Sequence, residues 1–199
     1  MAQVAVPFIG LTGGLGAGKS TALAALGRLG AEVLSSDAVV HELYERPPLR
    51  EAVLGRFGAQ VAPGGVVDRA AVAERAFANA EDRAWLESVV WPLVGARVAG
   101  WLEQARARHP APRAAVVEVP LLFEAGLANL YDATIAVVAE EGLRRERAAG
   151  RGHAQVDERA ARQLSQEEKA ALATFVVHND GSEQDLESKL SCVLEKLHE

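Results

Sequence analysis

The chain has 199 residues, 49% hydrophobic and 24% charged, which fits one sizeable core with a small appended subdomain rather than two independent domains. Its 27 Asp and Glu residues outnumber its 21 Lys and Arg residues, and a net charge of −6 argues against a nucleic-acid partner. No apolar run approaches the ~20 residues that span a bilayer, and residues 1–4 lack the basic segment of a signal peptide, so we expect a cytoplasmic protein with no membrane partner.

The N-terminal segment predicts a strand, a helix and a second strand. Residues 4–12 are apolar and β-branched up to a glycine cluster, which indicates a buried strand. Residues 20–29 carry leucines at helical spacing before Gly30, and residues 32–35 form a second short strand. A strand, helix and strand within about thirty residues favour a parallel sheet.

The middle of the chain is predicted to be helical. Residues 68–107 show helical apolar faces that include Phe77, and Pro92 is expected to break or kink the helix at Trp91. We interpret this segment as an insertion into the α/β pattern.

The second half of the chain returns to that pattern. Three further apolar strands are predicted, at residues 114–119, 134–139 and 174–177. Between the last two strands, the polar and arginine-rich residues 141–171 are expected to form a helical hairpin on the surface. An amphipathic helix over residues 183–197 closes the chain, and Cys192 on its apolar stripe is expected to be a buried thiol.

A phosphate-binding loop follows the first strand and matches G-x-x-x-x-G-K-[ST] in full. Glycines let successive backbone N–H groups point at phosphate oxygens, and the following helix adds the positive end of its dipole. Lys19 is expected to reach the β- and γ-phosphates of ATP, and the Ser20 hydroxyl to ligate Mg²⁺. The predicted ATP-binding residues of this segment are Gly13, Gly14, Leu15, Gly16, Ala17, Gly18, Lys19, Ser20 and Thr21.

The loop alone does not separate a kinase from a GTPase or an ATP-driven machine. His178-Asn179-Asp180-Gly181 lacks the lysine of the N-K-x-D motif with which GTPases recognise guanine, and the chain has little room for the further domains of a machine. A small-molecule kinase needs a carboxylate near the acceptor hydroxyl and arginines around the transferred phosphoryl group.

Asp37 and a group of arginines are the candidates for these roles. Asp37 follows the second strand, at the sheet edge where α/β sites gather, although it could equally be a helix N-cap. Arg144, Arg147 and Arg151 share one helix face by their spacing. Such a run is usually a solvated face paired with glutamates such as Glu146. Beside a phosphate-binding loop, an arginine-bearing lid is the favoured interpretation.

Together these segments resemble the dephospho-CoA kinase family, which transfers the γ-phosphoryl group of ATP to the ribose 3′-hydroxyl of dephospho-CoA in the last step of coenzyme A synthesis. The resemblance runs almost end to end, and the segment after the third strand is its most specific part. The motifs that carry it are residues 10–21, Ser36-Asp37, Asp68-Arg69, Trp91-Pro92, Pro120-Leu121-Leu122-Phe123-Glu124, Gln163, residues 167–169 and residues 176–179.

The resemblance implies an α/β fold of the P-loop NTPase type, with a central parallel sheet of about five strands flanked by helices. It implies one kinase domain made of a core, a helical acceptor-binding segment and an arginine-bearing lid. We place the core at approximately residues 1–46, 108–140 and 172–199, the acceptor segment at 47–107 and the lid at 141–171.

The resemblance also assigns roles to single residues. Asp37 would orient and deprotonate the 3′-hydroxyl, and Arg147 and Arg151 would act with Lys19 on the transferred phosphoryl group. Arg159 and Asn179 would contact ATP. The residues expected at the acceptor are Asp37, Arg69, Trp91, Leu122 and Glu124.

The chain departs from the family at Trp91-Pro92, where the family usually has His-Pro; an indole there could stack on the acceptor. ATP, dephospho-CoA and Mg²⁺ are the expected small-molecule partners, and Glu118 could assist Mg²⁺ through water or be only a strand-end charge. A monomer is favoured. Two other functions stay open: a kinase for another small molecule, such as a nucleoside monophosphate or a shikimate-like alcohol, and a non-catalytic ATP sensor.

Overall fold

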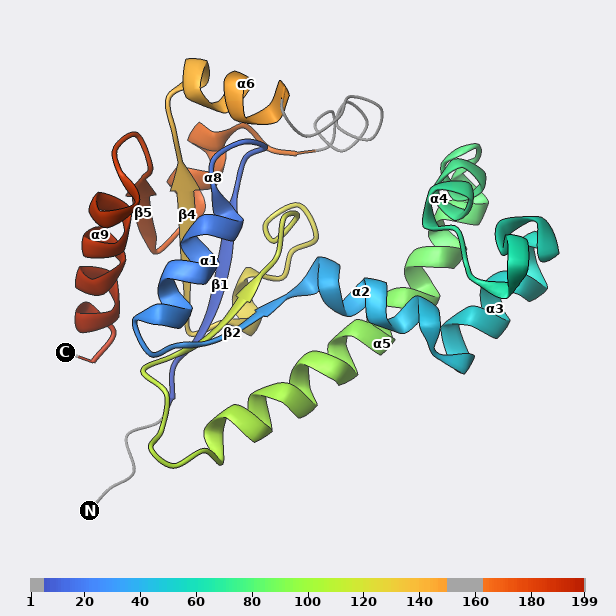
Figure 1. Cartoon of the computed structure of the whole chain (residues 1–199), viewed down its shortest axis with the longest axis horizontal. Coiled ribbons are helices and arrows are strands. Elements are labelled where there is room, and N and C mark those ends of the chain that lie inside the picture. Colours follow the sequence, from blue (N-terminus) through green and yellow to red (C-terminus); the bar gives the residue numbers. More distant parts are fainter. Residues whose placement is uncertain (1–5, 150–162, 199) are drawn as a thin grey trace. The chain divides into compact units, whose positions relative to one another are not determined.

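The computed structural model describes residues 6–149 and 163–198, and the chain folds as two compact units (Figure 1). The first, here called the sheet unit, comprises Met1–Ser35 and Gln104–Glu199. The second, the helical unit, comprises Ser36–Glu103.

The sheet unit contains a sheet of five parallel strands in the order β2-β3-β1-β4-β5, so all five predicted strands are confirmed. The strands are β1 (Phe8–Gly13), β2 (Glu32–Ser35), β3 (Ala115–Glu118), β4 (Ala133–Val138) and β5 (Phe175–His178). Leu11 of β1 pairs with Glu118 on one side and with Ile135 on the other, which makes β1 the central strand. The loop that follows β1 therefore leaves from the middle of the sheet.

The side chains of β1 alternate between two covered faces, as the pleat of a strand requires. Ile9 and Leu11 are buried in a core that includes α1 (Lys19–Arg28) and α9 (Glu183–Lys196), which pack against each other (Figure 1). Thr12 faces the other way, toward α8 (Gln166–Leu172).

Helix α9 has the amphipathic pattern that the sequence predicts. Ser182 caps its N-terminus, and its buried positions recur at spacings of three and four residues, at Leu186, Leu190, Val193 and Leu194. Cys192 falls between these positions and is exposed, so the expectation of a buried thiol is wrong.

The helical unit has its own buried residues, contributed by each of its first three helices. These are Val39 in α2 (Ser36–Glu45), Val53 in α3 (Pro47–Phe57) and Val72 in α4 (Arg69–Phe77). Short 3₁₀ turns at Ala59–Val61 and Pro63–Gly65 connect α3 to α4. Phe77 is exposed and does not join this core.

Helix α5 (Ala80–Arg106) continues through Pro92, so a break there is wrong, and the alternative of a kink at Trp91 stays a prediction. The helix instead accommodates the proline within its length. Within the helical unit, Phe57 packs edge-on against Trp85, with ring centroids 5.5 Å apart. Arg56 bonds to Asp82 at 2.7 Å, so α3 and α5 share apolar and charged contacts.

The arginine-rich segment contains two helices in its described parts, α6 (Glu141–Ala149) and α8. Ser165 and Glu168 form a capping box at the start of α8. A further 3₁₀ turn lies at Ala128–Leu130. Within the described residues, no helix combines the length and apolar character needed to cross a bilayer.

Candidate active site

The loop between β1 and α1 has the backbone shape of a phosphate cradle. Gly16 and Gly18 have φ values of 73° and 93°, in the left-handed region that favours glycine. Gly18 stands directly before α1, so the chain turns sharply into the helix at Lys19. These glycines allow the tight curl that places backbone N–H groups around an anion.

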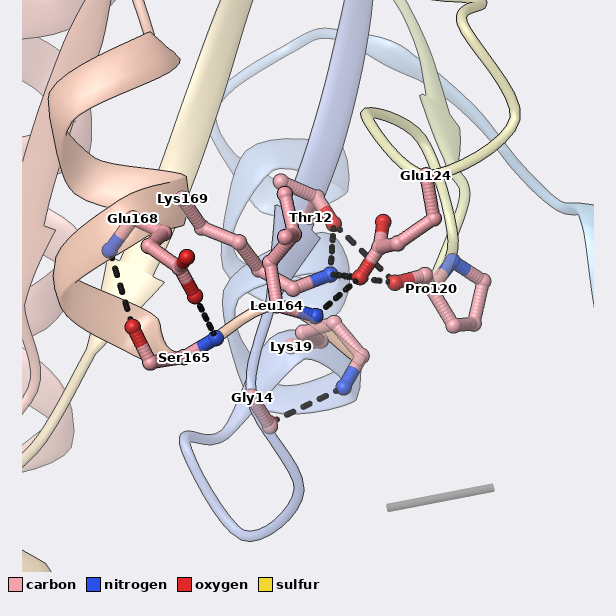
Figure 2. Close-up of polar contacts among 9 residues, drawn as sticks. All are labelled: Thr12, Gly14, Lys19, Pro120, Glu124, Leu164, Ser165, Glu168 and Lys169. Carbon is pink, nitrogen blue, oxygen red and sulfur yellow. Dashed lines mark hydrogen bonds and ion pairs between the residues drawn. The ribbon is translucent and has the colours of Figure 1, made fainter. Parts of the chain in front are cut away.

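Lys19 folds back over the loop. Its Nζ donates to the carbonyl oxygen of Gly14 at 3.1 Å (Figure 2), and Gly14 also accepts from the backbone N–H of Ala17 at 3.2 Å. The ammonium group is therefore held beside the loop, where a phosphate-binding lysine acts. Ser20, in the first turn of α1, is exposed.

Two side chains outside the loop hold its carbonyl groups. Nε of Arg144, in α6, donates to the carbonyl of Leu15 at 3.0 Å. Nδ2 of Asn179, directly after β5, donates to the carbonyl of Ala17 at 2.9 Å. Nη1 of Arg147 in turn donates to the backbone carbonyl of Asn179 at 3.1 Å. Sequence reasoning placed Arg144 on the arginine face but gave it no role.

A cavity of about 210 Å³ opens beside the α1 end of the loop. Its lining joins two predicted residues, Arg147 and Asn179, to the phosphate loop. The full lining is Gly16, Gly18, Thr21, Arg147, Asn179, Gly181 and Glu183. Asn179 is 6% exposed and its amide is bonded to Ala17, so much of its role here is to shape the loop.

Glu124 and Lys169 form an ion pair on the other side of β1 (Figure 2). The ammonium of Lys169 is 0% exposed and donates to Oε1 of Glu124 at 2.8 Å and to the carbonyl of Pro120 at 2.7 Å, with Oγ1 of Thr12 at 3.5 Å. The backbone N–H of Leu164 also donates to Oε1 of Glu124. Oε2 of Glu124 is buried and has no hydrogen-bond partner among the described residues.

The ion pair with Lys169 is a structural contact of Glu124 that the sequence did not predict. Lys169 belongs to a segment quoted for the family resemblance, but a lysine in a polar helix normally points to solvent. Its burial depends on how α8 packs against β1 and β4. Leu122 is also fully buried, against Gly10 of the central strand, so its side chain serves the core.

In the helical unit, Asp37 and Arg69 line one pocket of about 460 Å³, together with Ala38, His41, Glu42 and Glu45. Asp37 is the second residue of α2, so it is not that helix's N-cap. Asp68 caps α4 by accepting from the N–H of Ala70 at 2.9 Å, which places Arg69 in the first helical turn. A carboxylate and a guanidinium facing one pocket suit a hydroxyl-bearing anionic molecule.

Burial raises the pKa of Tyr44, in the same unit, and the nearby Arg69 opposes this shift by favouring the phenolate. Trp91 lies on α5 and is 58% exposed, so its indole is accessible to a ligand. Arg151 and Arg159 lie outside the described residues.

Mg²⁺ prefers hard oxygen ligands and keeps several waters when it binds with a nucleotide. From the sequence, the Ser20 hydroxyl is the expected oxygen ligand, and the Glu118 carboxylate is the candidate that would act through water. The exposed Ser20 follows Lys19 directly, and Glu118 is the last residue of β3. Among the described residues, no group of three His, Cys, Asp or Glu side chains is arranged to hold a metal. Such a group is unnecessary where phosphates supply most of the ligands.

Comparison with known proteins gives one consistent result. The family model described as dephospho-CoA kinase matches residues 7–185. A dephospho-CoA kinase of Anaeromyxobacter dehalogenans is 41% identical over 195 residues, covering 95% of this chain and 91% of that protein. A second, from Deinococcus radiodurans, is 40% identical over 196 residues with the same coverage.

Among solved structures, a Thermus thermophilus protein superposes with a TM-score of 0.80 at 35% identity, over 97% of this chain and 98% of the other. The parallel sheet, the phosphate loop after its central strand and the matched relatives agree. The chain therefore belongs to the dephospho-CoA kinase family.

Proposed function

We propose that this protein catalyses the ATP-dependent phosphorylation of the ribose 3′-hydroxyl of dephospho-CoA. The observation that carries the proposal is the complete phosphate loop, with Lys19 folded back onto Gly14, in a chain of this family. The product of the reaction is coenzyme A.

The donor side of the reaction is assigned to the sheet unit. Backbone N–H groups of the loop bind the phosphates of ATP, and Lys19 stabilises the charge that develops on the transferred group. Thr21 and Asn179 line the adjoining cavity, which suits the rest of the nucleotide. Mg²⁺, held by Ser20 and by phosphate oxygens, would supply further charge neutralisation.

The acceptor side rests on Asp37 and on residues named by the resemblance. Asp37 orients the acceptor hydroxyl and takes its proton as the phosphoryl group transfers in line. Arg69, in the same pocket, pairs with an anionic group of the acceptor. Trp91 offers an exposed ring for stacking.

Glu124 and Leu122 are assigned to the acceptor by the family resemblance. Of the two carboxylate oxygens of Glu124, Oε1 is already bonded, whereas Oε2 has no hydrogen-bond partner among the described residues. Oε2 is therefore the oxygen proposed to accept a hydrogen bond from a substrate. Leu122 would contribute through its backbone because its side chain is fully buried.

Arg147 and Arg151 are proposed to neutralise charge on the transferred phosphoryl group, and Arg159 to cover the nucleotide. Arg147 supports this by lining the nucleotide cavity, although its Nη1 is bonded to Asn179. A cytoplasmic monomer stays a prediction, to be tested by cell fractionation and light scattering.

The test is acceptor-dependent ADP release with Mg·ATP, comparing dephospho-CoA, AMP, adenosine and shikimate, with product mass recorded. Lys19→Met protein, prepared in parallel, measures contaminating activity. A gain of one phosphoryl group by dephospho-CoA alone supports the proposal. Turnover of another acceptor instead would refute the substrate assignment, and ATP binding without any turnover would favour the sensor.

A further inference from the structure

We propose that Arg144 is a positioning residue of the phosphate loop, whose hydrogen bond to the Leu15 carbonyl holds the Leu15–Gly16 peptide in its phosphate-binding orientation. The inference rests on the ATP-binding part of the proposed function and does not depend on the acceptor. It gives a role to an arginine outside the pair, Arg147 and Arg151, assigned to the transferred phosphoryl group.

The geometry of a peptide plane links the two sides of the loop. In a trans peptide the C=O and N–H bonds point in opposite directions. Arg144 lies in α6, outside the loop, and its Nε donates to the carbonyl oxygen of Leu15 at 3.0 Å. The N–H of Gly16, in the same peptide, is thereby directed away from α6, as an inward-pointing amide of an anion cradle must be.

The Ala17–Gly18 peptide is held in the same way as the Leu15–Gly16 peptide. Nδ2 of Asn179 binds the Ala17 carbonyl at 2.9 Å, which directs the N–H of Gly18 away from Asn179. Asn179 is buried, and Arg147 donates to its carbonyl at 3.1 Å. Two amides of the loop are therefore oriented by side chains from α6 and from the end of β5.

The loop needs such support because of its glycines. A peptide flanked by glycine reorients easily, since no Cβ restricts the backbone. The same glycines allow the supporting groups to approach closely. A Cβ at Gly16 would collide with the backbone carbonyl of Arg144, and one at Gly18 with the amide of Asn179. A Cβ at Gly14 would lie 3.0 Å from Nη2 of Arg144.

The charge of Arg144 also remains available to the nucleotide. Within residues 6–149 and 163–198, no carboxylate lies within ion-pair distance of Arg144. The pKa of Glu167 is lowered, and the largest cause is a hydrogen bond from its own backbone N–H. The positive charge of Arg144 also helps to lower this pKa, as the smallest of the causes. By contrast, the adjacent Arg145 is paired with Glu141 on the solvent side of α6.

Arg145 therefore provides a matched control for the experiment. We would measure dissociation constants for ATP, ADP and AMP by calorimetry in wild type, Arg144→Ala, Arg144→Lys and Arg145→Ala. A loop-positioning role predicts about tenfold weaker binding of ATP and ADP to Arg144→Ala, the loss of one hydrogen bond to a charged group. AMP, which lacks the β-phosphate that the loop encloses, should bind all four proteins alike.

Arg144→Lys separates the hydrogen bond from the charge, because lysine keeps the charge but lacks the planar guanidinium. We expect it to remain at least about fivefold weaker than wild type for ATP. Amide NMR of the nucleotide-free proteins should show a shifted Gly16 resonance in both Arg144 variants and not in Arg145→Ala.

Wild-type ATP affinity in Arg144→Lys would overturn the hydrogen-bond role. Equal weakening for ATP and AMP would show a general structural defect and also overturn it, as would equal effects of the Arg144 and Arg145 substitutions. If Arg144→Ala does not fold, Arg144→Lys carries the same comparison. Failure of the wild type to bind ATP would instead refute the proposed function.

Discussion

The ammonium group of Lys169 lies 2.8 Å from Oε1 of Glu124, and the lysine has no exposed surface. The pair joins α8 to the segment that follows β3, and further bonds from Lys169 to Pro120 and toward Thr12 extend it to the central strand (Figure 2). A buried charge pair of this kind is costly to break, because removing one partner leaves the other buried and uncompensated.

Lys169→Met should therefore lower the free energy of unfolding by about 3–5 kcal/mol. Urea denaturation followed by circular dichroism measures this change. Lys189→Met is the matched control, because Lys189 is exposed and pairs with Asp185 one helical turn away, where such pairs contribute about 0.3–0.5 kcal/mol. Equal stability of the two variants would show that the Lys169 pair contributes little.

Asp37→Asn should reduce kcat by about 10²–10⁴-fold if Asp37 is the general base, because the amide cannot take the acceptor proton. The protein should stay folded, since Asp37 lies at the pocket surface. Steady-state kinetics with dephospho-CoA measures the effect, and Glu51→Gln, an exposed site on α3, is the control. A loss below about tenfold would remove Asp37 from the base role.

Gly18→Ala should weaken ATP binding by at least about tenfold. A left-handed backbone costs a residue with a Cβ ~1–2 kcal/mol, and that Cβ would also displace the amide of Asn179 from Ala17. The control is Gly100→Ala in α5, where an added Cβ meets no atom within 4 Å. That substitution should stabilise the protein by about 0.5–1 kcal/mol and leave ATP affinity unchanged. Calorimetric titration with ATP distinguishes the two outcomes.

Trp91→Ala and Trp101→Ala should behave oppositely although both residues lie in α5. Trp91 is exposed, so its loss should change stability by no more than about 0.5 kcal/mol. It should raise KM for dephospho-CoA severalfold, because aromatic stacking contributes about 0.5–1.5 kcal/mol. Trp101 is 7% exposed, and its loss should cost about 3–5 kcal/mol. An unchanged KM in Trp91→Ala would exclude stacking on the acceptor.

Stability should fall at alkaline pH because burial raises the pKa of Tyr131 to about 12. The folded protein holds this proton more tightly than the unfolded chain, in which tyrosine titrates near pH ~10. The resulting stabilisation is complete below pH ~10 and is lost as the pH rises toward about 12.

Urea denaturation at pH values around 9, 10 and 11 should show a smaller decline in Tyr131→Phe than in wild type. The phenylalanine keeps the ring that packs on Phe8, with centroids 4.6 Å apart. Burial also raises the pKa of Tyr44, so some decline should remain in Tyr131→Phe. Parallel declines in the two proteins would contradict the assignment to Tyr131.

Features that depend on neighbouring residues in the chain could be predicted from the sequence. The five strands, the helix that follows the glycine-rich loop and the closing helix were all predicted correctly. Each follows from a short pattern, either apolar runs of strand length, a glycine-rich turn before a helix or apolar residues at helical spacing. Of the two outcomes expected at Pro92, a break was wrong, because a long helix can carry a proline within its length.

Side-chain environments that depend on packing could not be predicted in this way. Cys192 was expected on the apolar stripe of its helix yet is exposed, whereas Lys169 lies in a polar helix yet is fully buried. The sequence by itself determined a P-loop kinase fold and its phosphate cradle. Only the tertiary structure decided that Arg144 holds the loop at Leu15 and that Lys169 pairs with Glu124. These contacts join residues far apart in the chain, and small rotations of the packed helices would redirect such side chains.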